Sequence, residues 1–597
     1  MKYTILILFA ALITPTQAQS GELTVDEAQA FMDRAEARLM ELSIGAERAA
    51  WVAANFITMD TELIAAQADE ERISAIMTLA KEAAKFNKLH LPEDLARKMN
   101  LLKLATTLPA PSDSALSKEL TKTVVGMKGM YGKGTYTRKG SAKAMSLGEM
   151  SQIMAYSTNE KELLDVWQGW RTISKPMKQN YSRYVELANQ GAVELGYANV
   201  GEMWCSKYDM PAEDFPKELD RLWEQVKPLY ISLHAFVRMK LRDHYGKKLL
   251  PKGAPIPAHL LGNMWAQSWG NIYPLLGLKD ADPGYDLTGI LRRKKETPVG
   301  MIRHGENFFS SLGFTPLPDT FWSRSLFTKP QDRDVVCHAS AWCVDWEDDL
   351  RIKMCIEINE EDFITIHHEL GHNYYQRAYN EQSFLFRDSA NDGFHEAVGD
   401  TIALSATPEY LVKLGFIDSA PDPSKDVGLL LKMALEKIAF LPFGLLIDQW
   451  RWKVFAGEIT PENYNQKWWE LRGKYQGIVA PVERTEEDFD PGAKYHVASN
   501  VPYTRYFLAH ILQFQFHREL TKLAGETGPM HRRSIYNSKK AGKALNDMLA
   551  MGSVRPWPEA LAAMTGSTQM DAGAVIEYFA PLQEWLDVQL KNEKKGW

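Results

Sequence analysis

Apolar residues recur at helical spacing along most of this chain, and this pattern restricts its fold more than any other feature. Thr24 to Glu27 fits a capping box that opens a long amphipathic run. Strand patterns are few, and the best covers residues 350–358, where apolar residues partly alternate. The pattern predicts a mainly α-helical protein with little β structure. Further stretches with helical periodicity are residues 62–85, 146–173, 177–194, 218–245, 426–455 and 503–524.

Length and charge narrow the class of protein. A chain of 597 residues exceeds what one hydrophobic core usually serves, so length alone predicts two or more domains. No internal repeat, low-complexity tract or long linker divides it. The 69 basic and 76 acidic side chains give a net charge of −7. We therefore expect no nucleic-acid partner and no dependence on an anionic membrane surface.

The N-terminus has the pattern of a secretory signal peptide. Lys2 precedes an apolar run over residues 5–13, and small and polar residues follow as far as Ala18. We expect residues 1–18 to be the signal peptide and residues 19–597 the mature domain. The alternative is an ordinary N-terminal helix. The apolar run is short for a membrane span, and no later stretch is a candidate, so we predict a secreted or periplasmic protein without a membrane anchor.

Residues 368–372 read His-Glu-Leu-Gly-His. On a helix, positions i and i+4 share a face, so the imidazoles of His368 and His372 point to one spot with Glu369 beside them. This arrangement suits two zinc ligands and a carboxylate that acts on a water molecule. Asn359 and Asp362 are candidate caps for the helix. The alternative is a helix whose histidines are simply buried or solvated.

A second segment strengthens the metal interpretation. Glu396 lies 24 positions after His372, and Asp400 would share a helical face with it. Asn391 or Asp392 could cap that helix. A glutamate from a second helix is a common third zinc ligand, and Asp400 could fix the tautomer of a ligand histidine. The alternative is a solvated acidic face. No G-x-x-H follows His372, so the third ligand should be a glutamate.

Several segments together resemble the angiotensin-converting enzyme family of peptidyl-dipeptidases, over roughly residues 25–590. The resemblance implies one largely helical domain, with a deep cleft between two halves that N-terminal helices cover. This replaces the two-domain expectation from length. The matching segments are residues 255–267, 338–342, 367–372, 393–397, 431–444 and 503–507.

The resemblance assigns the metal and the base. It implies that His368, His372 and Glu396 bind Zn²⁺. Glu369 would be the general base toward the attacking water and then the proton donor to the leaving amine. Zinc lowers the pKa of water to about 7, which agrees with this chemistry at neutral pH.

The resemblance also implies how the substrate is held. Tyr506 and His496 would stabilise the oxyanion, where charge develops beside the metal. Ala339 and the nearby backbone would bind the peptide as an edge strand, and His338 and His496 would bond a substrate carbonyl.

The substrate's terminal carboxylate has three matching residues: Gln267, Lys494 and Tyr503. The carboxypeptidase homologue of the family carries an arginine at the glutamine position, which shortens the pocket. Gln267 therefore favours release of a dipeptide from short peptides rather than of one residue.

Family members are often activated by chloride. One anion site of the family matches Tyr245 and Arg505 here. A second matches Trp468 and Arg472, and Cys205 stands at the position of its other arginine. The alternative is that these arginines make ordinary ion pairs.

The cysteines leave part of their pairing open. Four cysteines allow three full pairings, and spacing cannot choose among them. The resemblance implies a disulfide between Cys337 and Cys355 and leaves Cys205 and Cys343 undecided. Unlike many animal members, the chain has no C-terminal anchoring helix, which favours a soluble bacterial homologue.

The sequence thus predicts a monomeric zinc peptidyl-dipeptidase. Its nearest rival is a single-residue carboxypeptidase. An inactive peptide-binding relative would need to have lost a ligand or the base, and none is lost. A structural helical protein with a fortuitous motif is the third alternative.

Overall fold

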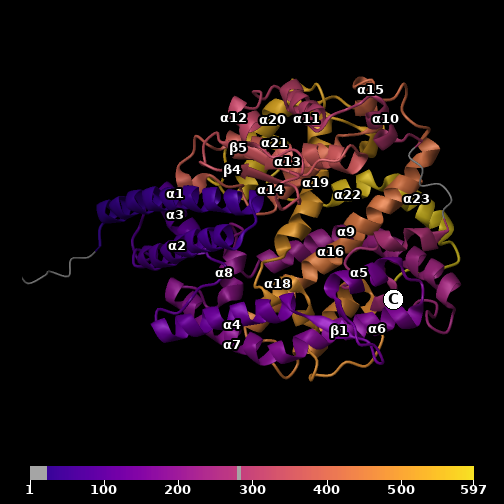
Figure 1. Cartoon of the computed structure of the whole chain (residues 1–597), viewed down its shortest axis with the longest axis horizontal. Helices are drawn as coiled ribbons and strands as arrows, with labels where there is room; N and C mark the ends of the chain where they lie inside the picture. Colours follow the sequence, from indigo (N-terminus) through magenta and orange to yellow (C-terminus); the bar gives the residue numbers. More distant parts are fainter. Residues whose placement is uncertain (1–22, 278–283) are drawn as a thin grey trace, which may run out of the picture.

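A computed structural model describes residues 23–277 and 284–597. The predicted signal peptide, residues 1–18, lies outside the described residues. Helices dominate the fold and the strands are short, as the helical periodicity predicted (Figure 1).

The α-helices are α1 (Val25–Asn55), α2 (Met59–Ala84), α3 (Glu93–Leu104), α4 (Ser114–Gly132), α5 (Leu147–Tyr156), α6 (Glu160–Arg171), α7 (Lys178–Leu195), α8 (Val200–Ser206), α9 (Phe215–Tyr245), α10 (Leu287–Arg293), α11 (Pro298–Leu312), α12 (Asp319–Arg324), α13 (Glu360–Ala378), α14 (Phe394–Leu404), α15 (Pro408–Lys413), α16 (Asp426–Phe455), α17 (Tyr464–Leu471), α18 (Tyr495–Ala498), α19 (Thr504–Leu523), α20 (Lys539–Leu549), α21 (Trp557–Thr565), α22 (Gly573–Tyr578) and α23 (Ala580–Gln589). Shorter helical turns are η1 (Thr172–Met177), η2 (Ala258–Leu260), η3 (Gly270–Leu276), η4 (Phe384–Phe386), η5 (Pro423–Lys425), η6 (Arg472–Gln476), η7 (Asp490–Ala493) and η8 (Met530–Arg532). The strands form three two-stranded pairs: β1 (Thr135–Thr137) with β2 (Ala144–Ser146), β3 (Ile256–Pro257) with β6 (Ile478–Val479), and β4 (Ser340–Cys343) with β5 (Leu350–Lys353).

The helix predictions are mostly confirmed. Thr24 and Glu27 form the expected capping box, each side chain accepting a hydrogen bond from the other's backbone N–H. One prediction is wrong, because residues 146–173 are not one continuous helix. Asn159 caps a new helix, α6, and residues 144–146 pair with β1 as strand β2.

Helix α16 is the central element of the core. Most of its side chains are buried, as expected of a helix that lies in the interior of a large protein. It packs against α9 and α19, and Figure 1 shows its orange ribbon crossing the middle of the molecule.

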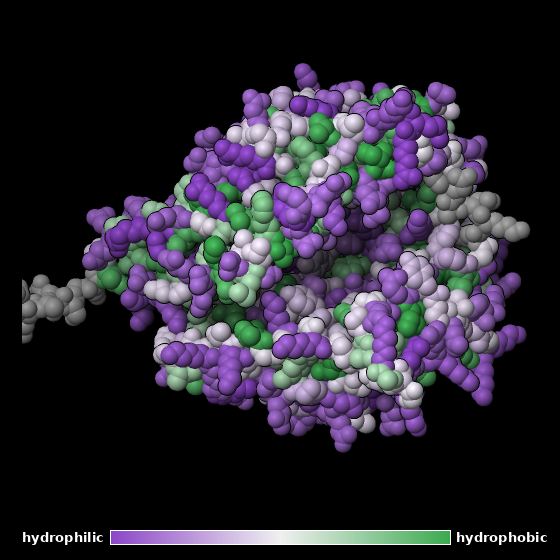
Figure 2. All heavy atoms as spheres, viewed as in Figure 1, coloured by the Kyte–Doolittle hydropathy of each residue, from purple (hydrophilic) through white to green (hydrophobic). Residues whose placement is uncertain are grey.

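The molecule has two halves around a cleft. In Figure 1, α11, α13 and α14 lie in the upper half, and α4, α6, α7 and α18 lie in the lower half. Figure 2 shows the surface deeply hollowed between them. A single buried apolar cluster nevertheless extends through both halves. The two-domain expectation from length is therefore wrong, and the chain forms one large helical domain.

The three N-terminal helices have a small core of their own, which includes Phe31, Leu39, Phe86 and Met99. Helix α2 contacts α7 of the lower half, and α1 and α3 contact the turn η4. Figure 1 shows this group at the left end of the molecule.

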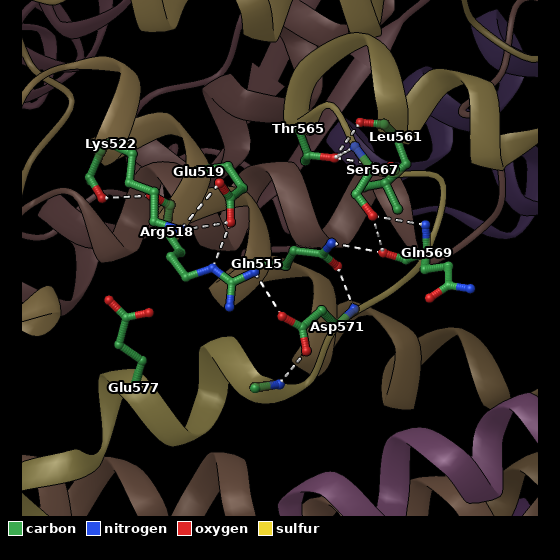
Figure 3. A network of polar contacts seen from close by, with 12 residues as sticks. Gln515, Arg518, Glu519, Lys522, Leu561, Thr565, Ser567, Gln569, Asp571 and Glu577 are labelled. Carbon is green, nitrogen blue, oxygen red and sulfur yellow. Dashed lines mark hydrogen bonds and ion pairs between the residues drawn. The ribbon is translucent and has the colours of Figure 1, made fainter.

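Helix α19 is fastened to the C-terminal segment by polar contacts (Figure 3). The Arg518 guanidinium lies 2.8 Å from a carboxylate oxygen of Asp571, and Gln515 exchanges hydrogen bonds with the backbone of Gln569 and Asp571. These contacts hold the C-terminal half of a helix whose first turn reaches the cleft.

The predicted disulfide joins Cys337 and Cys355, while Cys205 and Cys343 are free. It links the segments just outside β4 and β5, so it closes the open end of this hairpin. No helix in the described ranges is both long and apolar enough to span a membrane.

A buried carboxylate ties the start of α19 to α16. Asp448 accepts hydrogen bonds from the Arg451 guanidinium, from the backbone N–H groups of Tyr503 and Thr504, and from the Thr504 hydroxyl. Both charged side chains are almost fully buried, at 1% exposure each.

We expect Asp448→Ala to lower the free energy of unfolding by about 3–5 kcal/mol, because it leaves Arg451 buried and unpaired. Urea denaturation followed by circular dichroism measures this. Glu119→Ala removes one of the two carboxylates that pair with Arg183 at the surface, and it should change stability little. Equal effects of the two substitutions would contradict the buried network's role.

Candidate metal centre and active site

Helix α13 presents the two predicted histidine ligands. Its first turn is capped by Asn359, whose side chain accepts a hydrogen bond from Asp362 N at 2.7 Å. His368 and His372 follow one another on the same face, with their Nε2 atoms 3.1 Å apart. The helix therefore brings two imidazole nitrogens to one spot, as the spacing predicted.

Helix α14 carries Glu396 and Asp400. It begins after Gly393 without a side-chain cap, and Asn391 instead accepts a hydrogen bond from the N–H of Gly393 in the preceding turn. The prediction that Asn391 or Asp392 caps this helix is therefore wrong.

Two glycines let α13 and α14 approach closely. A β-carbon on Gly371 would lie 2.8 Å from the Cα of Gly399. A β-carbon on Gly399 would lie 2.8 Å from His368 Nδ1. Any larger residue at either position would push the helices apart or turn the His368 ring.

His368, His372 and Glu396 form a cluster that fits a metal ion. One ligand atom from each lies within 4.8 Å of the others, and His368 Nε2 is 3.6 Å from Glu396 Oε2. Ligands about 2.0–2.1 Å from a tetrahedral zinc ion would stand slightly more than 3 Å apart. Two imidazole nitrogens and a carboxylate oxygen at these separations match such a donor set.

A second layer of contacts orients the ligands. Asp400 Oδ1 lies 3.2 Å from His368 Nδ1, and Lys437 donates to the other Asp400 oxygen at 2.8 Å. This is the contact predicted for Asp400. His372 Nδ1 is 3.1 Å from His395 Nδ1. No role was predicted for His395, although it lies inside a matched segment beside Glu396.

Burial and neighbouring charges shift the pKa values of His368, His372 and Glu369 in different directions. Burial lowers the pKa of His372 to about 4, so its imidazole is neutral, the form that binds metals. Burial would also lower the pKa of His368, but hydrogen bonds with Asp400 and Glu396 raise it to about 10. Burial raises the pKa of Glu369 above its ordinary value, which suits a carboxyl group that both accepts and donates a proton.

The other predicted polar residues form a cluster around α18 and the start of α19. Lys494 Nζ donates to Gln267 Oε1 at 2.6 Å and lies 5.4 Å from the Tyr503 ring. The Tyr503 ring lies 4.6 Å from that of His496 and 5.0 Å from that of Tyr506. The structure thus brings together the five residues predicted for the oxyanion and the terminal carboxylate.

Two of these groups are suited to donate hydrogen bonds. Burial, with a contribution from Glu396, raises the pKa of Tyr506, so the phenol keeps its proton. Burial and the nearby Lys494 lower the pKa of His496 to about 3, so this imidazole is neutral and one ring nitrogen carries a proton.

Strand β4 supplies a backbone edge. In the described part of the chain it pairs with β5 alone, which leaves its second edge without a strand partner. Ala339 directly precedes β4, and the exposed His338 donates from Nδ1 to the Ala339 carbonyl at 2.9 Å. A free strand edge is a common binding surface for an extended peptide.

The structure does not bring Tyr245 and Arg505 together, so this predicted anion site is wrong. Tyr245 ends α9 and lines a cavity with Leu163. Arg505 lines a separate cavity with Tyr208, and its Nη2 lies 3.4 Å from Asp392 Oδ2. The charge of Arg505 is therefore already balanced by a carboxylate.

At the second predicted anion site, the structure places Trp468 and Arg472 close together, but the third residue beside them is not Cys205. The Arg472 guanidinium lies 5.6 Å from the Trp468 ring. Cys205 is not its partner, because the charges that act on this buried thiol are those of Asp448 and Glu202. Arg171, which no motif indicated, is a buried arginine whose pKa is lowered to about 9 by burial and by the charge of Arg472.

We expect Gly399→Ala to weaken zinc binding at least tenfold, because the added methyl group displaces the His368 ring from Asp400. Competition against a chromophoric chelator measures the affinity. Gly126→Ala is the matched control, since Gly126 lies in α4 with open space around it. Unchanged zinc affinity in Gly399→Ala would show that the close approach of the helices is not needed.

Comparison with known proteins places this site in a family. The sequence profile of the angiotensin-converting enzyme family matches residues 23–597. Angiotensin-converting enzyme of Bos taurus is 40% identical over 578 residues, or 96% of this chain and 44% of that protein. Its counterpart in Theromyzon tessulatum is 47% identical over 452 residues, or 75% of this chain and 73% of that protein. The chain spans less than half the length of the Bos taurus protein. The match over residues 23–597 shows that this chain belongs to the angiotensin-converting enzyme family.

Proposed function

We propose that this protein is a zinc-dependent peptidyl-dipeptidase that releases C-terminal dipeptides from short peptides. The observation that carries the proposal is a pair of facing sites. The metal-ligand cluster lies on α13 and α14 in the upper half, and Lys494 with its polar cluster lies beside α18 in the lower half. A peptide bound in the cleft would meet both.

His368, His372 and Glu396 would hold the Zn²⁺ ion, which when bound supplies a Lewis acid and lowers the pKa of water to about 7. Asp400 fixes the tautomer of His368 through Nδ1, so that Nε2 is available to the metal. The displaced proton of His368 makes metal affinity depend on pH.

Glu369 would move the protons of the reaction. It accepts a proton from the attacking water as general base and delivers it to the leaving amine as general acid. Burial raises its pKa above the ordinary value, which favours a carboxyl group that holds the proton between the two steps.

Tyr506 and His496 would stabilise the oxyanion, since both carry a donor proton at neutral pH. Ala339 and the open edge of β4 would align the peptide backbone, and His338 would bond a substrate carbonyl beside them.

The carboxylate pocket sets the register of cleavage. Gln267, Lys494 and Tyr503 would bind the terminal carboxylate, with Lys494 as its cation. Gln267 is shorter than the arginine found in the family's carboxypeptidase, which leaves room for two residues beyond the cut bond. A covered cleft would restrict substrates to short, unfolded peptides.

Chloride activation is the finer part of the proposal. Two buried arginines, Arg171 and Arg472, support a chloride site. Their Nε groups lack a hydrogen-bond partner among the described residues. An anion between them would relieve their mutual repulsion. The signal peptide, the domain boundary at residue 19, export and a monomeric state are further parts of the same proposal.

We expect a blocked model peptide to lose its C-terminal dipeptide in the presence of zinc, and a chelator to stop the release. Mass spectrometry of the products measures both. Glu369→Gln is the control, since it should bind zinc yet release nothing. Release of a single residue would contradict the proposal that Gln267 leaves room for a dipeptide. Absence of cleavage despite bound zinc would instead favour a relative that only binds peptides.

The pH dependence should report Lys494. Burial, with the charge of Arg472, lowers the pKa of Lys494 to about 7. Below this pH the free enzyme holds a cation that attracts the substrate carboxylate, and above it the cation is lost. We therefore expect kcat/KM to fall above about pH 7. Lys494→Arg keeps its charge and should remove this decline, so a decline that persists in Lys494→Arg would assign it to another group.

A further inference from the structure

The loop that ends at Gln267 is held by an unusual set of buried donors. Three consecutive carbonyl oxygens, those of residues 264–266, each accept a hydrogen bond from a different buried side chain. We call these donors the carbonyl clamp. The contacts are Arg171 Nη2 to Met264 O at 3.0 Å, Arg472 Nη2 to Trp265 O at 2.6 Å, and Gln476 Nε2 to Ala266 O at 3.0 Å.

The last clamped residue has a strained backbone. Ala266 is fully buried and has φ +51°, in the left-handed region that crowds the β-carbon of an alanine. The surroundings must hold it there. Trp269 Nε1 also donates to the Ala266 carbonyl, at 3.3 Å, and the Ala266 N–H donates to the Asn263 carbonyl at 2.9 Å.

Gln476 is the part of the clamp with no second role in the proposed chemistry. It ends the π-helical turn η6 and is fully buried. Its own carbonyl accepts a hydrogen bond from the Tyr230 hydroxyl at 2.7 Å. The next carbonyl, of Gly477, accepts from the Ile256 N–H at 2.9 Å. The backbone of Gln476 is thus fixed, and its amide points at Ala266.

We propose that Gln476 is a positioning residue that sets the substrate register by holding Ala266 in its left-handed conformation and so directing the next side chain, Gln267, toward Lys494. This rests on the proposed function, because it assigns Gln267 to the substrate carboxylate. The hydrogen bond from Lys494 to Gln267 at 2.6 Å is the contact that depends on this direction. Gln476 itself touches no substrate.

The first test removes the donor. We expect Gln476→Leu to raise KM for a peptide with a free C-terminal carboxylate roughly tenfold, with kcat little changed, because the loss falls on ground-state binding. In a Gln267→Ala background the same substitution should have little further effect. Gln513→Leu is the matched control, since Gln513 is a fully buried glutamine on α19 that donates to the Ala509 carbonyl.

The second test changes the strain instead of the donor. Glycine adopts a positive φ without crowding, so Ala266→Gly should bring the raised KM of Gln476→Leu most of the way back to that of the unmodified protein. A role of Gln476 in stability alone would show no such rescue. Gln476→Met, which keeps the length of the side chain and has no hydrogen-bond donor, gives the same comparison if Gln476→Leu does not fold.

The outcomes separate this inference from the proposed function. If the unmodified protein does not release dipeptides, the proposed function fails. If it does release dipeptides, three results would contradict the role of Gln476. These are an unchanged KM in Gln476→Leu, an equal rise of KM in the Gln267→Ala background, and a raised KM that Ala266→Gly does not lower.

Discussion

The contact between Gly371 and Gly399 is the constraint on which the metal site depends. Helix α13 fixes two histidines by its own periodicity, but the third ligand belongs to another helix. The missing side chains at these two glycines allow α14 to lie close enough for Glu396 to complete the set and for Asp400 to reach His368. The close packing of two rigid helices thus holds the three ligand side chains in position for the metal.

The opposite wall of the cleft depends on buried polar contacts. Asp448 on α16 holds the first residues of α19, and this places Tyr503 and Tyr506 beside His496. Lys494 is buried next to them, which lowers its pKa. The charged groups Asp448 and Lys494 stay buried because each has a hydrogen-bond partner, since a lone buried charge is costly. The two walls are therefore built differently, and one apolar core holds them together.

Local sequence patterns predicted the helices better than they predicted which residues contact one another in the fold. The range 426–455 is helix α16 itself, because an apolar helix leaves a clear signal in the sequence. The range 146–173 was overextended, because Asn159 begins a new helix inside a run that keeps helical spacing. The pairing of Tyr245 with Arg505 failed for another reason. A motif match does not show which side chains lie close together in the folded chain. In the structure, the carboxylate of Asp392 lies beside the Arg505 guanidinium.

The sequence by itself determined the helical class, the spacing that places His368 and His372 together, and the glutamate that follows. These depend on residues near one another along the chain, where helix geometry acts directly. Only the tertiary structure decided that Arg171 accompanies Arg472, that His395 supports His372, and that Gln476 reaches Ala266 across 210 positions. Such contacts follow from the packing of the whole chain, and no local periodicity encodes them.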